Sequence, residues 1–299
     1  MTESVRKVGT PDGALTGDSR RASVVLADFA TEALAAFLDE ARAKGGAVAL
    51  LPIGSTEPHG PHLPLSTDIV LSEEACRRAT RALAERGIPA LVAPPIAYGV
   101  TRYAAGFRGA VGVSEATLVG LLTDVARALL DDGFVHVALV NNHLEPEHVA
   151  TIERAAAQIA TERGGRCISF PNQLTRRWGR TLTDEFKRGD CHAGRYETSL
   201  VLAARPDLVD SGVARGLESL PISLSQAITA TSGAPVRFAE IGMNRAYTGA
   251  PAEATAAEGE TTYERLVEMI TTEVTEHLRA DAARATTSAP GPQKEEKQR

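Results

Sequence analysis

One stretch of this chain, residues 48–68, constrains the fold more than any other. Its first half is a short apolar run rich in Val, Leu and Ile, which is typical of a strand buried inside a sheet. Its second half places Glu57, His59, His62 and Asp68 among several Gly and Pro residues, which are typical of a rigid loop. The stretch therefore predicts a buried strand that runs into a loop rich in carboxylate and imidazole groups.

These side chains are suited to binding divalent metal ions. Carboxylate oxygens and imidazole nitrogens together suit Zn, Mn or Fe, because these cations accept mixed ligand sets. Glu57 and His59 are two positions apart, so in an extended segment they point to the same side. Pro58, Pro61 and Pro64 fix φ, which lowers the entropy lost when the loop holds its ligands in place.

Segments with helix and strand patterns alternate along most of the chain. Helices are expected at residues 31–44, 71–86, 114–132, 146–163 and 256–283, and further strands at residues 90–93, 135–140 and 166–170. This alternation predicts an α/β fold, a single three-layer α/β/α domain with a mainly parallel sheet. We expect the last helix to lie across the outside of the domain.

The domain is expected to span residues 24–283. Residues 1–23 and 284–299 are polar and without periodicity, so they could not bury enough apolar surface to offset their ordering entropy. We therefore expect both ends to be disordered. Residues 211–260 are rich in Gly, Ser, Thr and Pro; they predict no regular element, and we expect them to supply pocket or subunit contacts.

Composition limits which kinds of binding partner and which cellular compartment are expected. The net charge of -6 shows no basic excess, which argues against nucleic acid or an anionic membrane surface as the main partner. No apolar run approaches the roughly 20 residues that cross a bilayer, and residues 1–21 lack the apolar centre of a secretion signal. The 3 cysteines form no Cys-x-x-Cys pair, so reduced thiols and a cytoplasmic location are expected.

A second polar cluster follows the strand predicted at residues 135–140. In open α/β sheets the ligand crevice lies beyond the carboxyl ends of the strands, so this cluster should converge with the first. The two clusters offer the candidate ligands Glu57, His59, Asp68, His143 and Glu145. This set exceeds what one four-coordinate zinc with an open position needs, and it fits two divalent ions with Asp68 as the bridge.

A third cluster, residues 190–199, opens a helix that is expected to end before Pro206. His192 stands at the glycine-containing entrance of this helix, where an imidazole is suited to carry protons. Glu197 follows in the first turn, from which its carboxylate would face the metals. We therefore expect His192 and Glu197 to take part in the chemistry.

Three segments together resemble a known family. They are Pro-Ile-Gly-Ser-Thr-Glu-Pro-His-Gly-Pro-His-Leu-Pro-Leu-Ser-Thr-Asp (52–68), Asn-Asn-His-Leu-Glu (141–145) and His-Ala-Gly-Arg-Tyr-Glu-Thr-Ser (192–199). In this order they resemble the motifs of the creatininase (creatinine amidohydrolase) family, over about residues 48–209.

The resemblance implies a metal-dependent hydrolase of C–N amide bonds, because family members act on cyclic amides, formamides and modified peptides. It also implies a homo-oligomer, commonly a hexamer. It places Glu57, His59, Asp68, His143 and Glu145 on the metal-ligand positions, with Asp68 bridging. It further places His192 on the proton-transfer histidine and Glu197 on the acidic residue that completes the site.

The chain also departs from the family pattern. Many members have Asn-Gly-His-Gly-Gly-Asn in the second motif, whereas this chain keeps an acid, Glu145, as creatininase itself does. Creatininase also has tryptophans around its substrate just before the third motif. Here the single tryptophan, Trp178, lies fourteen residues before His192, which argues against creatinine as the substrate.

Structural readings of the same residues stay open. The first cluster would otherwise be a solvated, charged turn, and His143 with Glu145 a helix cap and a first-turn acid. His62 is as well explained by hydrogen bonding within the Pro-rich loop as by ligation. Cys191 beside His192 is unsuited to a Cys/His nucleophile, because adjacent residues rarely hold that geometry.

The leading hypothesis is hydrolysis of a small, possibly cyclic, amide. We expect two divalent ions, Zn in preference to Mn or Fe. Water bridging them would lose a proton and attack the carbonyl carbon, while His192 protonates the departing nitrogen. One alternative is a deformylase or a peptide-trimming hydrolase in cofactor or natural-product biosynthesis. Another is a non-catalytic, metal-stabilised binding protein, against which the presence of both His192 and Glu197 argues.

Overall fold

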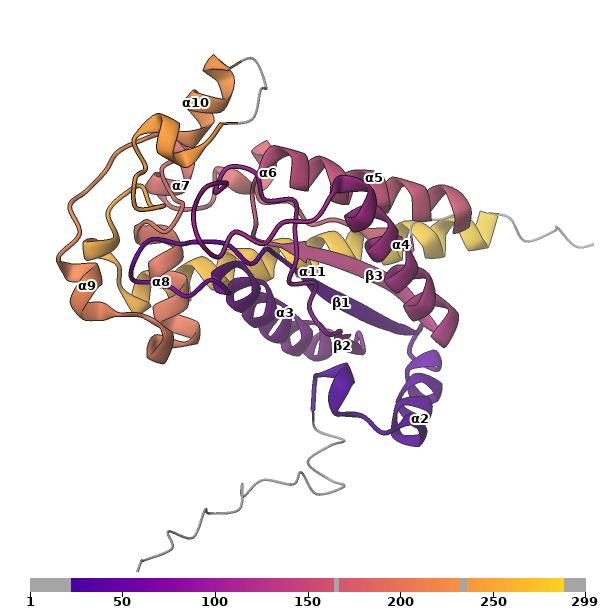
Figure 1. Cartoon of the computed structure of the whole chain (residues 1–299). Helices are drawn as coiled ribbons and strands as arrows, with labels where there is room; N and C mark the ends of the chain where they lie inside the picture. Colours follow the sequence, from indigo (N-terminus) through magenta and orange to yellow (C-terminus); the bar gives the residue numbers. More distant parts are fainter. Residues whose placement is uncertain (1–22, 164–166, 232–235, 288–299) are drawn as a thin grey trace, which may run out of the picture.

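A parallel sheet forms the centre of the computed structural model, which describes residues 23–163, 167–231 and 236–287 (Figure 1). Its strands are β1 (Ala47–Ile53), β2 (Ala90–Val92), β3 (Phe134–Asn141) and β4 (Ile168–Ser169), in the order β2-β1-β3-β4. β1 lies between β2 and β3, with Leu50 opposite Val92 on one side and Ala138 on the other. Every residue of β1 is buried, which explains its continuous apolar sequence.

Helices cover both faces of this sheet. The long ones are α2 (Thr31–Arg42), α3 (Thr67–Glu85), α4 (Glu115–Asp132), α5 (Pro146–Arg163), α8 (Arg195–Ala204) and α11 (Ala256–Thr287). Alternate side chains of β1 point to opposite faces: Val48 and Leu50 join the core under α3, α8 and α11, whereas Leu51 and Ile53 join the core under α2, α4 and α5. The predicted three-layer α/β/α architecture is confirmed.

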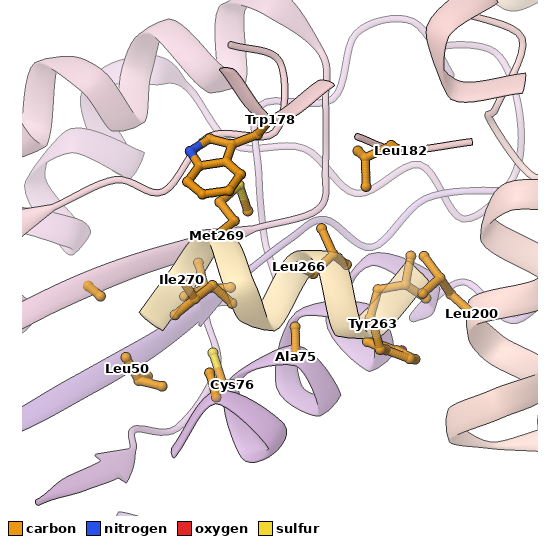
Figure 2. Close-up of a cluster of buried hydrophobic side chains, with 14 of the residues drawn as sticks. Leu50, Ala75, Cys76, Trp178, Leu182, Leu200, Tyr263, Leu266, Met269 and Ile270 are labelled. Atoms are coloured by element: carbon orange, nitrogen blue, oxygen red, sulfur yellow. The ribbon is translucent and has the colours of Figure 1, made fainter. Parts of the chain in front are cut away.

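The last helix forms part of a layer. α11 packs on α8, α3 and β3, and Figure 2 shows Leu266 and Ile270 of α11 among side chains from α3 and the sheet. Trp178 packs against the same helix and donates a 2.7 Å hydrogen bond to Glu273. The helix therefore covers one face of the sheet, where it closes a core, and it runs past the predicted end at residue 283 to Thr287.

Most of the predicted elements are confirmed with small shifts of their ends. The prediction for α4 is the most accurate, because Ser114 caps its first turn and Gly133, at φ 113°, ends it. α3 begins at Thr67, four residues before the predicted start, so Asp68 lies in the first turn of a helix. The prediction that Asp68 stands on the loop is therefore wrong. β4 is shorter than the predicted strand, of which residue 166 lies outside the described residues.

Short elements occupy the part of the sequence that predicted no regular structure. They are α9 (Ser211–Arg215), α10 (Leu224–Ala230), η3 (Phe238–Ile241) and η4 (Pro251–Glu253). The other short elements lie earlier in the chain and are η1 (Leu26–Asp28), α6 (Arg176–Gly179), α7 (Asp184–Arg188) and η2 (Pro206–Leu208). Phe238 and Met243 join Tyr103 in a separate apolar cluster, which fixes this segment against the loop after β2. Figure 1 shows α7 to α10 gathered at one end of the molecule, away from α2.

The predicted disordered ends, residues 1–23 and 284–299, lie almost wholly outside the described residues; only residue 23 and the last turn of α11 are described. Of the helices that the structure describes, none combines the length and the apolar character needed to span a bilayer.

Candidate metal centre

The loop after β1 brings its polar side chains back against the start of α3. Gly54 allows this approach, because a Cβ at this position would lie 2.6 Å from the Cβ of Asp68. The backbone N–H of Ser55 donates to Asp68 Oδ2 at 3.2 Å and so fixes that carboxylate. The carboxyl end of β3 lies beside that of β1, which carries His143 to the same place.

Two groups of candidate ligands share one carboxylate. The first is Glu57, Asp68 and His143, and the second is His59, Asp68 and Glu197; in each group the ligand atoms lie within 4.8 Å of one another. Asp68 Oδ1 lies 3.1 Å from His59 Nε2, and Asp68 Oδ2 lies 3.2 Å from His143 Nδ1. The two oxygens of Asp68 therefore face different histidines, which is the arrangement that a bridging carboxylate requires.

The tautomers of both histidines are fixed by carbonyl oxygens. His59 Nδ1–H donates to the carbonyl of Glu57 at 3.1 Å, so Nε2 is the nitrogen that faces Asp68 and Glu197 and that could bind a metal ion. His143 Nε2–H donates to the carbonyl of Val100 at 2.9 Å, so Nδ1 is the nitrogen that faces Glu57 and Asp68. Hydrogen bonds of this kind orient histidines that bind metals.

The cluster holds a surplus of buried negative charge. Burial alone would lower the pKa of His59, but the carboxylates of Asp68 and Glu197 raise it to about 10. Burial would likewise lower the pKa of His143, and Glu57 and Asp68 raise it well above its ordinary value. Burial would raise the pKa of Asp68, yet the two histidines hold it well below its ordinary value. A site that attracts positive charge so strongly also favours divalent cations.

Unpartnered atoms support the same conclusion. Among the described residues, Glu57 Oε2 and His59 Nε2 are buried without a hydrogen-bond partner. Buried polar atoms without partners are uncommon in native proteins, and a bound ion is one explanation for them; here two such atoms lie within one ligand cluster. The donor set of carboxylates and imidazoles therefore fits two divalent ions, one in each group.

His192 lies beside this cluster and forms a third group of possible ligands with Glu57 and His59, which does not include Asp68. Its Nε2–H donates to the carbonyl of Pro58 at 3.1 Å, which leaves the Nδ1 lone pair 3.9 Å from Glu57 Oε1. Its ring packs against Phe238 and His59, at centroid distances of 4.5 and 4.4 Å. Burial, together with the positive charge on His59, lowers the pKa of His192 to about 4, so the imidazole is neutral.

Glu197 lies within one of the two ligand groups, close enough to bind a metal ion directly. Its Oε2 is 3.5 Å from His59 Nε2 and accepts the N–H of Ala193 at 2.7 Å. Ala193 has a φ of 50°, a conformation that L residues rarely adopt, in the turn that starts α8. Burial raises the pKa of Glu197 to about 8, against the opposing effect of His59.

The structure does not bring Glu145 into either ligand group. Its carboxylate accepts the backbone N–H groups of Arg102 and Tyr103, with Oε2 at 2.8 and 3.1 Å. Oε2 lies 4.0 Å from His143 Nε2, on the side of that ring that faces away from the cluster. Burial raises the pKa of Glu145 to about 7, although His143 and the two N–H groups oppose this shift.

Asn141 supports the cluster from behind, a role that the sequence did not predict. Its side-chain amide donates to the carbonyl of His143 at 2.6 Å, and its Oδ1 accepts the N–H of His143 at 3.1 Å. The same Oδ1 accepts Nε2–H of His148 at 3.0 Å. The one available signal was the pair of asparagines that precedes His143. His62 Nε2 lies 2.8 Å from Thr198 Oγ1 and belongs to neither ligand group. This hydrogen bond joins the loop to α8, so the prediction of a hydrogen bond within the Pro-rich loop is wrong about the partner.

A cavity of about 550 Å³ opens over the cluster. Its floor is formed by Glu57, Asp68, His143, Glu145, His192 and Glu197. Its wall comes from the segment around α6 and α7, from α10 and from Phe238, with the apolar side chains Leu174, Phe186, Leu224, Ile228 and Phe238. Trp178 does not line the cavity, because it is buried in the core against α11. The predicted role of residues 211–260 in the pocket is thus confirmed for this part of them.

Comparisons with known proteins agree with this geometry. The sequence model of the creatininase family, described as creatinine amidohydrolase, matches residues 32–274. The chain is 33% identical over 229 residues to the mycofactocin precursor peptide peptidase of Mycolicibacterium smegmatis, covering 73% of this chain and 80% of that protein. It is 33% identical over 187 residues to the creatinine amidohydrolase of Pseudomonas putida, covering 57% of this chain and 70% of that enzyme.

Solved structures share the fold. A crystal structure of creatininase superposes with a TM-score of 0.66 at 22% identity, covering 86% of this chain and 98% of that one. Related creatininase structures are described as a Zn-Zn type and a Mn form. The resemblance predicted from the three motifs is confirmed, and the chain belongs to the creatininase family of hydrolases.

Proposed function

We propose that this protein is a metal-dependent amidohydrolase that cleaves a C–N amide bond in a peptide-like substrate. The observation that carries the proposal is the pair of ligand groups, joined at Asp68, on the floor of a cavity of about 550 Å³. Both named relatives act on such bonds, one on creatinine and one on a precursor peptide. The peptidase matches a larger share of this chain.

Two ions would be held by the residues of the two groups. Glu57, Asp68 and His143 would hold one ion, and His59, Asp68 and Glu197 would hold the other. This proposal makes Glu197 a ligand and gives Glu145 a different role. When bound, Zn or Mn would polarise the amide carbonyl and activate water for attack.

Proton transfer falls to groups at the edge of the cluster. His192 is held by Pro58 and Phe238 in one tautomer, with Nδ1 free to accept a proton beside Glu57. Glu145 lines the cavity next to His143 and is fixed by two backbone N–H groups, so its carboxyl group is placed to exchange a proton with a departing nitrogen. The turn at residues 102 and 103 therefore has a function in positioning Glu145.

The cavity favours a larger substrate than creatinine. Its volume lies within the range that holds drug-sized ligands, and most of its wall is apolar. Its wall also lacks a tryptophan, since Trp178 belongs to the core. An inert, purely structural metal site would be closed by its ligands, whereas this one opens into the cavity, which argues against the non-catalytic alternative.

Metal content and turnover test the proposal together. We expect about two equivalents of Zn or Mn per chain after purification without chelator, and loss of amide hydrolysis after chelation. Asp68→Asn should lower metal content and abolish turnover, while Asp207→Asn, on an exposed carboxylate outside the cavity, should leave both unchanged. Undiminished turnover in metal-free protein or in Asp68→Asn would overturn the proposal.

A further inference from the structure

Two arginines line the cavity without an acidic partner. Arg176, in α6, and Arg180, directly after it, are exposed and both form part of the cavity wall. Within residues 23–163, 167–231 and 236–287, no carboxylate lies within ion-pair distance of either one. Arg180 is the C-cap of α6 and has helical backbone angles, so the two arginines, four positions apart, lie on the same side.

The neighbouring basic residues differ in this respect. Arg177 makes hydrogen bonds of 2.8 and 2.7 Å to the two carboxylate oxygens of Glu276 and stacks on Trp178. Lys187 lies 3.1 Å from Asp184, and Arg188 lies 3.4 Å from Asp190. Arg176 and Arg180 are therefore the arginines of this segment whose charge is directed to the cavity and left uncompensated.

The acidic groups that line the cavity are all on its floor. They are Glu57, Asp68, Glu145 and Glu197, which belong to the candidate metal centre or contact it. Apolar side chains, including Leu174 and Phe186, line the wall along with the arginines. A molecule bound here thus meets the metal centre, an apolar surface and a pair of guanidinium groups.

From this arrangement we infer that Arg176 and Arg180 bind a carboxylate of the substrate, so that the enzyme selects amides that carry a free carboxylate beyond an apolar group. Guanidinium groups suit this role because their N–H donors match the geometry of carboxylate oxygens. The inference rests on the proposed hydrolase function and narrows its substrates to peptide-like acids. In a peptide substrate with a free C-terminus, the C-terminal carboxylate is the group that the two arginines would bind.

Matched pairs of substrates test this inference. Short N-acyl peptides with a free terminal carboxylate are compared with the same peptides ending in an amide, on metal-loaded protein. We expect the Arg176→Gln/Arg180→Gln variant to raise KM for the acids by about tenfold, with KM for the amides and kcat for both unchanged. Arg215→Gln is the matched control, because Arg215 is exposed, lies outside the cavity and makes no ion pair with any residue that the structure describes.

Direct binding separates this inference from the proposed function. Calorimetry with N-acetylleucine and N-acetylleucinamide measures the preference for the acid without requiring turnover, in the wild type and in the double variant. A preference that the double variant loses supports the inference even if no peptide is hydrolysed, in which case only the proposed function fails. Hydrolysis with the same ratio of acid to amide KM in the wild type and the double variant overturns the inference and leaves the proposed function standing.

Discussion

Gly259 of α11 packs directly against the backbone carbonyl of Ser199 in α8, with no space for a side chain between them. A Cβ at residue 259 would also lie 2.8 Å from the Cβ of Ala203. The two helices form the most extensive helix pair in the fold, and α8 carries Glu197. The position of a candidate metal ligand therefore depends on a glycine more than sixty residues away.

Gly259→Ala should destabilise the protein by about 1–3 kcal/mol, because the added methyl group must push two backbones apart. Gly120→Ala is the matched control. Gly120 also lies in a helix, but a Cβ there meets nothing within 4 Å, so the substitution should stabilise by about 0.5–1 kcal/mol. Urea unfolding of both variants measures the difference. Equal stability of the two variants would show that α8 and α11 do not pack as described.

Glu185 is a buried carboxylate with a structural role. Its Oε2 accepts the N–H of Tyr196 at 2.6 Å, and its Oε1 accepts the N–H of Ala250 at 2.8 Å. Glu185→Gln replaces one acceptor with a donor, so one buried N–H loses its partner, at a cost of about 1–3 kcal/mol. Glu218→Gln, on an exposed side chain, should be neutral in the same unfolding experiment.

The stability difference at Glu185 should also depend on pH. Burial raises the pKa of Glu185 above its ordinary value of 4.5, although its backbone hydrogen bonds oppose this. The folded state then binds the proton more tightly than the unfolded state, so this contribution is fully present below the unfolded pKa and is lost as pH rises through the folded pKa. The advantage of the wild type over Glu185→Gln should therefore be largest below the ordinary pKa of 4.5 and shrink as pH rises through the higher folded-state pKa. An advantage that grows as pH rises would contradict the raised pKa.

Asn141→Ala should weaken metal binding without touching a ligand. The substitution removes both hydrogen bonds that hold the backbone of His143 and the contact that holds His148. Loss of such supporting groups lowers metal affinity by about 10-fold to 100-fold. Competition with a chromophoric chelator measures the affinity, with Gln158→Ala, at an exposed position of α5, as the control. An unchanged affinity would mean that His143 needs no support from Asn141.

His192→Ala should separate metal binding from turnover. The variant keeps both ligand groups that share Asp68, so the metal content should stay at its wild-type level. Removing a proton-transfer group lowers kcat by about 10²-fold to 10⁴-fold. Elemental analysis and steady-state kinetics on one preparation check both statements. A normal rate would remove the role proposed for His192, and a loss of metal would make it a ligand.

The layers and the polar clusters could be predicted because their signals are local. The apolar run that starts at Val48 and the capped segment that starts at Ser114 each specify their own element, and parallel strands bring their carboxyl ends together. The position of Asp68 in the first turn of α3 could not be predicted, because the start of this helix depends on the loop that packs against it. The separation of Glu145 from the ligand groups rests on N–H donors more than forty residues earlier.

The residues that form the wall of the cavity could not be predicted from the sequence for a related reason. Phe238 meets His192 only because short elements without clear patterns fold back over the loop that contains Tyr103. Trp178 could have been read as a pocket residue, yet its indole N–H finds Glu273 on α11. Contacts of this range leave no periodic trace in the sequence. The hexamer, the cytoplasmic location and the identity of each metal stay predictions.

The floor and the wall of the cavity come from different parts of the chain. The floor is anchored to the sheet and to the starts of α3 and α8, while the wall is made of short helices and loops around residues 174–189, of α10 and of Phe238. A mutation in the wall can therefore change which molecules fit without moving a single candidate ligand. Related enzymes can therefore keep the same catalytic residues while substitutions in single surface segments change their substrate specificity.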